Sequence, residues 1–156
     1  MTGLARAAEV ATTVAAVSTG LVGGVYAAFS TMVMPALRSG PPAEALTVMQ
    51  RINVHALQPG FMLIFWASAA ASAAALALNW VPGGARSGWA TAGAGLALAG
   101  FAITVVLNVP RNNALAGLDP LSAADLRTAG DLLGQWVVAN HARTAASALA
   151  LVAFLR

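Results

Sequence analysis

The sequence predicts an all-α membrane protein: a four-helix bundle with short amphipathic helices in the two connections on one side. Of its 156 residues, 59% are hydrophobic and only 8% are charged, whereas soluble domains carry roughly 25% charged residues. The mean hydropathy is +0.76. Four apolar segments follow one another, each about as long as the 20 or so residues that a helix needs to cross a bilayer.

Charge and cysteine content exclude several classes of function. The formal net charge of +3 comes from scattered arginines without a basic run, so the lipid bilayer is an expected partner and nucleic acid is not. The absence of cysteine excludes disulfides, thiolate metal sites, iron–sulfur clusters and covalent c-type haem. Arg6 followed by an apolar run resembles a signal peptide, but the run is too long, so we expect a retained first span.

The first half of the chain predicts a span, an amphipathic helix and a second span. Span one covers about 7–34 and should end before Pro35, because the residue preceding a proline disfavours helix. Its small residues should let another helix approach closely, or allow a homo-oligomer: Gly20, Gly24, Ala27 and Thr31. Pro41 precedes a short helix that is too polar to span and should lie in the interface. Span two covers about 59–80.

After an exposed turn at 81–87, the second half repeats this layout. Span three covers about 88–108 and should stop at Asn108. The stretch Ser122-Ala-Ala-Asp125 has the form of a capping box, so a helix should start there and can continue into span four, about 136–155. We therefore predict one four-span domain over 1–156, an integral multi-pass protein of the cell membrane if its source is bacterial.

Four spans place both termini on one side of the membrane and both long connections on the other. Nearly all unusual polar residues belong to the second side: Arg51, Asn53, His55, Gln58, Asn108, Arg111, Asn112, Asn113, Trp136, Asn140, His141 and Arg143. Polar groups in lipid are costly unless they face protein or water, and Trp136, Asn140 and Arg143 share one helix face. We expect a polar site at this end of the bundle and plain scaffolding at the other end. The positive-inside rule favours the cytoplasmic side for the polar end only slightly.

Four stretches carry a resemblance to a known family. They are Val33-Met-Pro35-Ala-Leu37, Met49-Gln-Arg-Ile-Asn53, Asn108-Val-Pro110-Arg-Asn112 with Leu115, and Trp136 with Asn140-His141-Ala-Arg143-Thr144. In order and spacing, the chain resembles the anthrone oxygenases, small four-span membrane proteins whose better-known members are fungal polyketide-pathway enzymes. Arg111 departs from the apolar residue expected at its position, which leaves room for a changed substrate.

The resemblance implies a membrane oxidoreductase that uses O₂ to oxidise an apolar, anthrone-like aromatic substrate. A base removes a proton from the methylene between two aryl rings, and the carbanion reacts with O₂ without a metal. His141 is the expected base, since imidazole titrates near neutrality, and Arg143 the expected oxyanion donor together with amides. The expected substrate-binding residues are Asn53, Asn108, Asn112, Trp136 and Asn140.

Each of these residues also has a structural interpretation. His141 and the amides could serve only as hydrogen-bonded links between helices, and Arg143 could tie span three to span four. No metal or other cofactor is predicted, because nothing in the spacing supports a metal or haem held by His55 or His141. The alternative function is a non-enzymatic membrane protein that binds a small apolar or aromatic ligand, or scaffolds a partner. An enclosed cavity lined by His141 and Arg143 would favour the enzyme; the same residues bonded to one another would favour the alternative.

Overall fold

The computed structural model describes residues 3–84 and 86–156, which are helical apart from turns and contain no strand. In chain order the helices are α1 (Gly3–Ala28), η1 (Phe29–Val33), α2 (Met34–Arg38), α3 (Pro42–Ala56), α4 (Pro59–Trp80), α5 (Gly88–Ile103), η2 (Thr104–Asn108), α6 (Val109–Ala116) and α7 (Ala123–Phe154), with η1 and η2 π-helical. Four stretches are long and apolar enough to cross a membrane: Gly3–Arg38, Pro59–Trp80, Gly88–Ala116 and Ala123–Phe154. The predicted all-α four-helix bundle is confirmed.

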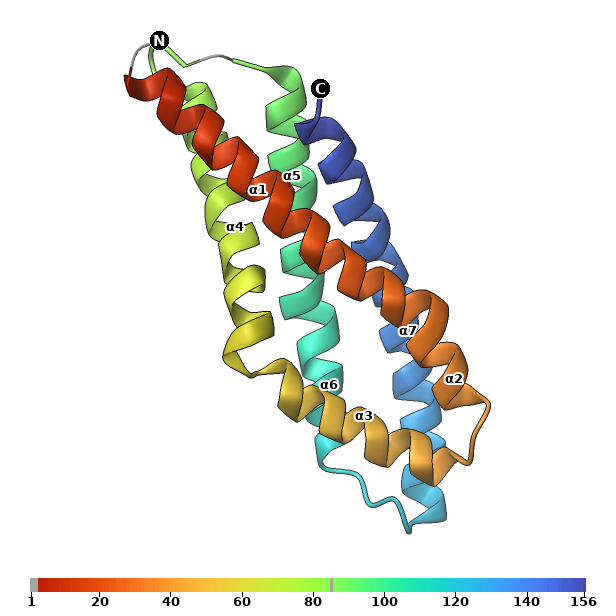
Figure 1. Ribbon diagram of the computed structural model, residues 1–156. Helices are drawn as coiled ribbons and strands as arrows, with labels where there is room; N and C mark the ends of the chain where they lie inside the picture. The colour runs from red at the N-terminus through yellow and green to blue at the C-terminus, as the bar shows by residue number, and fades with distance from the viewer. Residues whose placement is uncertain (1–2, 85) are drawn as a thin grey trace.

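The four long helices form a ring in which α1 packs against α4 and α7, and α5 packs against the same two helices (Figure 1). Both ends of the chain lie at one end of the bundle, together with the turn between α4 and α5 (Figure 1). The helix α3 lies across the opposite end (Figure 1). The predicted placement of the two longer connections on one side is therefore correct.

Two prolines lie inside their helices, contrary to the expectation that span one ends before Pro35 and span three stops at Asn108. Proline lacks an N–H group, and in an α-helix its ring clashes with the carbonyl four residues earlier. Pro35 follows the π-helical turn η1, and Pro110 follows η2. The wider π turn relieves this clash because its hydrogen bonds reach five residues back. Both helices therefore continue, to Arg38 and to Ala116.

The connection between α2 and α4 closes one end of the bundle, as its amphipathic pattern predicts. Leu46 and Met49 of α3 are fully buried in an apolar cluster that also contains Leu115 and Trp136. The side-chain amide of Gln50 donates to the carbonyl of Leu115, in the last turn of α6, at 2.9 Å and to that of Leu118, just after α6, at 3.0 Å. These contacts hold α3 against α6 and α7.

The helix α7 begins at the predicted capping box and continues without interruption. The Ser122 hydroxyl accepts from the amide of Asp125 at 3.2 Å, so it satisfies one of the amides that a helix start leaves unpaired. The first half of α7 lies at the end of the bundle that α3 covers, and the second half of α7 runs through the bundle toward the opposite end (Figure 1). One helix therefore joins the connection to the centre of the bundle.

The close approach of α1 to α7 depends on Gly23, which the predicted stripe did not include. A Cβ added at Gly23 would lie 2.8 Å from the Cβ of Ser147, whereas one added at Gly24 would meet nothing within 4 Å. Gly20 makes a looser approach, 3.4 Å from the side chain of Leu151. Because Gly23 brings the helices together, Tyr26 of α1 and Ser30 of η1 are placed against the polar face of α7.

Candidate functional site

The polar face of α7 turns into the bundle, as the sequence predicts. Asn140 is completely buried, and Trp136, Arg143 and Ser147 expose 3, 6 and 4% of their surfaces. The residues that meet this face come mainly from α1, η1 and η2. The candidate site thus lies where the two π-helical turns flank α7.

Arg143 is held by neutral partners only. Its Nε and Nη2 donate to the Oδ1 of Asn140 at 3.0 and 2.8 Å, and its Nη1 donates to the Oγ1 of Thr104 at 3.1 Å. Its guanidinium carbon lies 3.8 Å from the centre of the Tyr26 ring and 5.2 Å from that of Trp136. None of these partners is a carboxylate, so the positive charge is surrounded by amide and hydroxyl oxygens and ring faces.

A second set of hydrogen bonds connects Asn140 to His141 through Ser30 of η1. The Nδ2 of Asn140 donates to the carbonyl of Tyr26 at 2.9 Å and to the Oγ of Ser30 at 2.7 Å. The Oγ of Ser30 lies 2.9 Å from the Nδ1 of His141. His141 itself is exposed on the flank of α7. A continuous chain, Arg143–Asn140–Ser30–His141, therefore joins a buried guanidinium to an exposed imidazole.

Three residues of this network were not among the predicted site residues: Tyr26, Ser30 and Thr104. The Tyr26 hydroxyl lies 3.3 Å from the Oγ1 of Thr104, which donates to the carbonyl of Gly100 and accepts from Arg143. The sequence carries weak signals for them. Tyr26 is the only tyrosine, Ser30 lies one turn after it, and Thr104 lies one turn before Asn108.

The other predicted residues form a neighbouring group around Trp136. The Nδ2 of Asn108 donates to the carbonyl of Trp136 at 3.2 Å, while its buried Oδ1 has no partner among the described residues. The indole Nε1 of Trp136 donates to the Oδ1 of Asn112 at 2.7 Å. Trp136 also packs on Phe29 with ring centres 5.6 Å apart. These contacts join η1, η2, α6 and α7 next to the Arg143 network.

Asn53 and His55 lie apart from both groups, on α3. Asn53 is half-buried, and its side-chain nitrogen has no partner among the residues that the structure describes. His55 is exposed. In the described ranges, no three histidine, aspartate or glutamate side chains gather closely enough to hold a metal ion.

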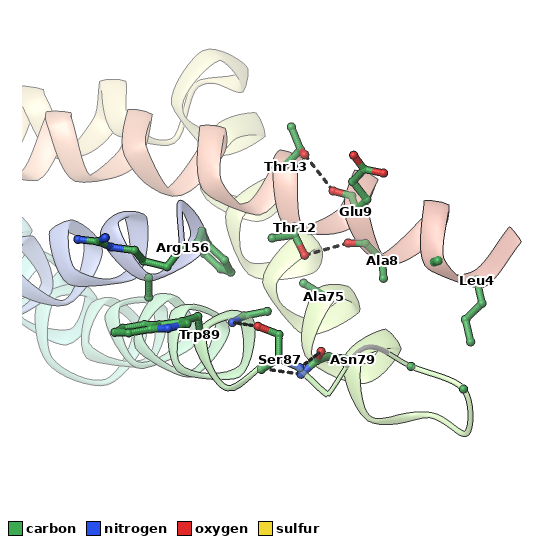
Figure 2. A pocket seen from close by; sticks show the side chains of 16 residues that line it. Leu4, Ala8, Glu9, Thr12, Thr13, Ala75, Asn79, Ser87, Trp89 and Arg156 are labelled. Carbon is green, nitrogen blue, oxygen red and sulfur yellow. Dashed lines mark hydrogen bonds between the residues drawn. The ribbon is translucent and has the colours of Figure 1, made fainter. Parts of the chain in front are cut away.

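A cavity lies at the opposite end of the bundle, where the sequence led us to expect plain scaffolding (Figure 2). It has a volume of about 460 Å³, is partly open to the outside, and is lined by residues near the ends of α1, α4, α5 and α7. That expectation was wrong because small side chains, among them Ala8, Ala75 and Ala153, line these helix ends and leave space between them. A void of only about 10 Å³ lies beside Tyr26 and Ser147.

Neither of these two spaces is lined by His141 or Arg143. Both side chains are bonded within the network, which is the arrangement that the alternative, non-enzymatic function predicts. Catalysis at these residues therefore requires a substrate that approaches the exposed flank of α7, where His141 lies.

A model of the anthrone oxygenase family matches residues 46–153 of the chain. No curated protein and no solved structure matches it. The matched range contains most of α3, all of α4 to α6 and nearly all of α7, and with them Thr104 and the polar face of α7. Two site residues lie outside the matched range, Tyr26 of α1 and Ser30 of η1.

Proposed function

Because this chain belongs to the anthrone oxygenase family, we propose that it is a membrane oxidoreductase that uses O₂ to oxidise a polycyclic aromatic substrate of the anthrone type. We assign the reaction to the neighbourhood of His141 and Arg143. The observation that carries this assignment is the hydrogen-bond chain between them, which couples an exposed imidazole to a buried guanidinium without a carboxylate partner.

The environment of Arg143 suits the stabilisation of an anion. A buried cation that lacks an opposite charge keeps most of its field, because no partner cancels it and little water screens it. An anion that forms nearby is therefore favoured, and donors fixed before the reaction need no reorganisation. Asn140 and Thr104 fix the guanidinium in place from two directions.

His141 has the surroundings that a general base requires. The Oγ of Ser30 accepts from Asn140 and has two acceptors for its own proton, Thr144 at 3.4 Å and His141 at 2.9 Å. When that proton points to Thr144, the Nδ1–H of His141 donates to Ser30 and the Nε2 lone pair is free. In this tautomer, the exposed nitrogen takes the proton from the substrate.

The reaction balances without a further reductant. His141 removes a proton from the methylene between the two aryl rings, which leaves an electron-rich enolate at the exposed flank of α7, linked to Arg143 through Ser30 and Asn140. The enolate carbon transfers electrons to O₂ and forms a carbon–oxygen bond, giving a hydroperoxide once a proton is added. Loss of the second methylene proton with cleavage of the O–O bond leaves a ketone and one water. The methylene carbon loses four electrons in total, two in each step. These electrons reduce the two atoms of O₂, one of which becomes the carbonyl oxygen and the other water.

Access from the bilayer fits this proposal. His141 is exposed on the flank of a membrane-spanning helix, and its Nδ1 is the nitrogen that lies against Ser30. A flat, apolar tricyclic molecule partitions into lipid and reaches that flank laterally. The substrate then needs no enclosed cavity that His141 and Arg143 both line.

The test is O₂ uptake by purified protein in nanodiscs supplied with an anthrone. We expect His141→Ala to lower turnover by roughly 10²–10⁴-fold, the contribution that a positioned base usually makes. His55→Ala is the matched control, since His55 is the other histidine and is also exposed, and it should leave turnover unchanged. Circular dichroism should show both variants folded; wild-type turnover in the folded His141→Ala variant would remove the base assignment.

The second candidate is a non-enzymatic membrane protein that binds a small apolar aromatic ligand. The observation that favours it is that Arg143, Asn140 and Ser30 are bonded to one another. This function predicts that an anthrone binds, as followed by tryptophan fluorescence, without consumption of O₂ by the wild-type protein. Binding with O₂ uptake supports the oxidoreductase instead.

A further inference from the structure

The side-chain amide of Asn140 can take only one orientation, because the guanidinium of Arg143 donates hydrogen bonds and cannot accept them. The Nε and Nη2 of Arg143 both donate to the Oδ1 of Asn140, at 3.0 and 2.8 Å. The amide nitrogen therefore faces the other way, where it donates to the carbonyl of Tyr26 at 2.9 Å and to the Oγ of Ser30 at 2.7 Å. Both amide protons are then used, and Ser30 is an acceptor in its bond with Asn140.

The hydroxyls of Thr104 and Thr144 end the network as acceptors. Each hydroxyl donates to the backbone carbonyl four residues earlier, at 3.0 Å in Thr104 and at 2.7 Å in Thr144. A hydroxyl has a single proton, so neither threonine can donate a second time. Thr104 accordingly accepts from the Nη1 of Arg143 at 3.1 Å. Thr144 in turn can only accept from Ser30, whose Oγ lies 3.4 Å away.

The hydroxyl proton of Ser30 has two possible directions, toward Thr144 or toward the Nδ1 of His141 at 2.9 Å. If it points to His141, the oxygens of Ser30 and Thr144 face each other without a proton between them. If it points to Thr144, His141 donates its Nδ1–H to Ser30, and each of these polar groups has a partner. The second arrangement contains one hydrogen bond more. Since Ser30 and Thr144 are both half-buried, we expect the arrangement that leaves neither unpaired.

We propose that Thr144 is a positioning residue for His141: it accepts the proton of Ser30, and the imidazole is thereby held as the Nδ1–H tautomer with Nε2 unprotonated. This inference rests on the proposed function, in which His141 is the base. Without the acceptor on Thr144, the Ser30 proton turns to Nδ1, and the neutral ring carries its own proton on Nε2. A protonated Nε2 cannot take a proton from a substrate.

Nitrogen-15 NMR of the histidine rings tests the tautomer without any substrate. The labelled protein is studied in nanodiscs well above pH 6.5 or so, where an ordinary imidazole is neutral. Protonated and unprotonated ring nitrogens resonate well apart, and His55→Gln assigns the signals of the two histidines. We expect wild-type His141 to have a protonated Nδ1 and an unprotonated Nε2. An Nε2–H tautomer in the wild-type protein would overturn the proposal.

Substitutions of Thr144 test whether this residue sets the tautomer. Thr144→Val keeps the shape of the side chain and removes its hydroxyl, so His141 should change to the Nε2–H tautomer. Thr144→Ser keeps the hydroxyl and should retain the wild-type pattern. Thr31→Val is the matched control: Thr31 is exposed on η1 next to Ser30, and it also donates to the carbonyl four residues earlier, at 2.8 Å. An unchanged tautomer in Thr144→Val, or the same change in Thr31→Val, would contradict the positioning role.

O₂ uptake with an anthrone separates this inference from the proposed function. A positioned base contributes roughly 10²–10⁴-fold to a rate, so Thr144→Val should lower turnover at least about tenfold, while Thr144→Ser and Thr31→Val should keep it. If the wild-type protein consumes no O₂ but shows the expected tautomers, the proposed reaction is rejected and the role of Thr144 in holding the ring stands. Wild-type turnover by Thr144→Val with His141 in the Nε2–H tautomer would reject the positioning role and leave the reaction in place.

Discussion

The guanidinium carbon of Arg143 lies 3.8 Å from the centre of the Tyr26 ring. Tyr26 exposes only 2% of its surface, so this contact is shielded from solvent and joins α7 to α1 within the bundle. The face of an aromatic ring carries negative charge density, which attracts a cation by about 2 kcal/mol or more when both groups are desolvated. The Tyr26 ring therefore supplies part of the compensation that no carboxylate gives to Arg143.

Replacement of Tyr26 should separate the contribution of its ring from that of its hydroxyl. Tyr26→Phe keeps the ring over Arg143 and loses the hydroxyl with its 3.3 Å contact to Thr104, so the free energy of unfolding should fall by less than about 1 kcal/mol. Tyr26→Leu loses the ring face and should cost at least about 2 kcal/mol. Equilibrium unfolding in detergent micelles measures both; equal losses would show that the hydroxyl matters more than the ring.

Arg143 should matter more for activity than for stability. Arg143→Met removes the cost of a buried charge together with its hydrogen bonds, so the free energy of unfolding should change by less than about 2 kcal/mol. Loss of the preorganised positive charge should lower O₂ uptake with an anthrone by roughly 10²–10³-fold. Arg111→Met is the control, because Arg111 bonds to Leu107 and Gln135 on the exposed side. Severe unfolding of Arg143→Met with full activity in its folded fraction would assign Arg143 a structural role.

Two adjacent glycines should respond oppositely to the same substitution. Gly23→Ala places a methyl group 2.8 Å from the Cβ of Ser147, so α1 and α7 must separate, at a cost of about 1–3 kcal/mol. Gly24→Ala meets no atom within 4 Å and should be neutral or stabilise the helix by up to about 1 kcal/mol. Thermal unfolding of the two variants in the same detergent gives the comparison. A larger loss for Gly24→Ala would mean that α1 is rotated relative to this structure.

The bond between Trp136 and Asn112 should appear as a pairwise coupling. In a double-mutant cycle with Trp136→Phe and Asn112→Ala, the coupling free energy should be about 1 kcal/mol, since each change alone breaks the 2.7 Å bond. Asn113→Ala should show no coupling to Trp136→Phe, because Asn113 is the exposed neighbour. A coupling free energy near zero for Trp136 and Asn112 would show that they do not form this hydrogen bond, and both side chains would then be free to contact a ligand.

The candidate site was predictable on α7 and much less so elsewhere. The spacing of Trp136, Asn140 and Arg143 places them on one face, and a polar face in an apolar helix must turn inward. The partners on α1 and η1 could not be found in this way. Tyr26 and Ser30 lie in an apolar span whose packing depends on Gly23, and periodicity alone did not single out Gly23 over Gly24.

The sequence by itself determined that the chain is a bundle of four membrane helices with its longer connections at one end, because apolar length and chain order leave no other arrangement. Only the tertiary structure decided that Pro35 and Pro110 lie within their helices, since a π turn before each removes the clash that local rules assume. The tertiary structure also decided which neutral groups surround Arg143 and that a cavity opens at the end of the bundle where the termini lie. Both depend on side chains from helices far apart in the sequence, which meet only when the bundle packs.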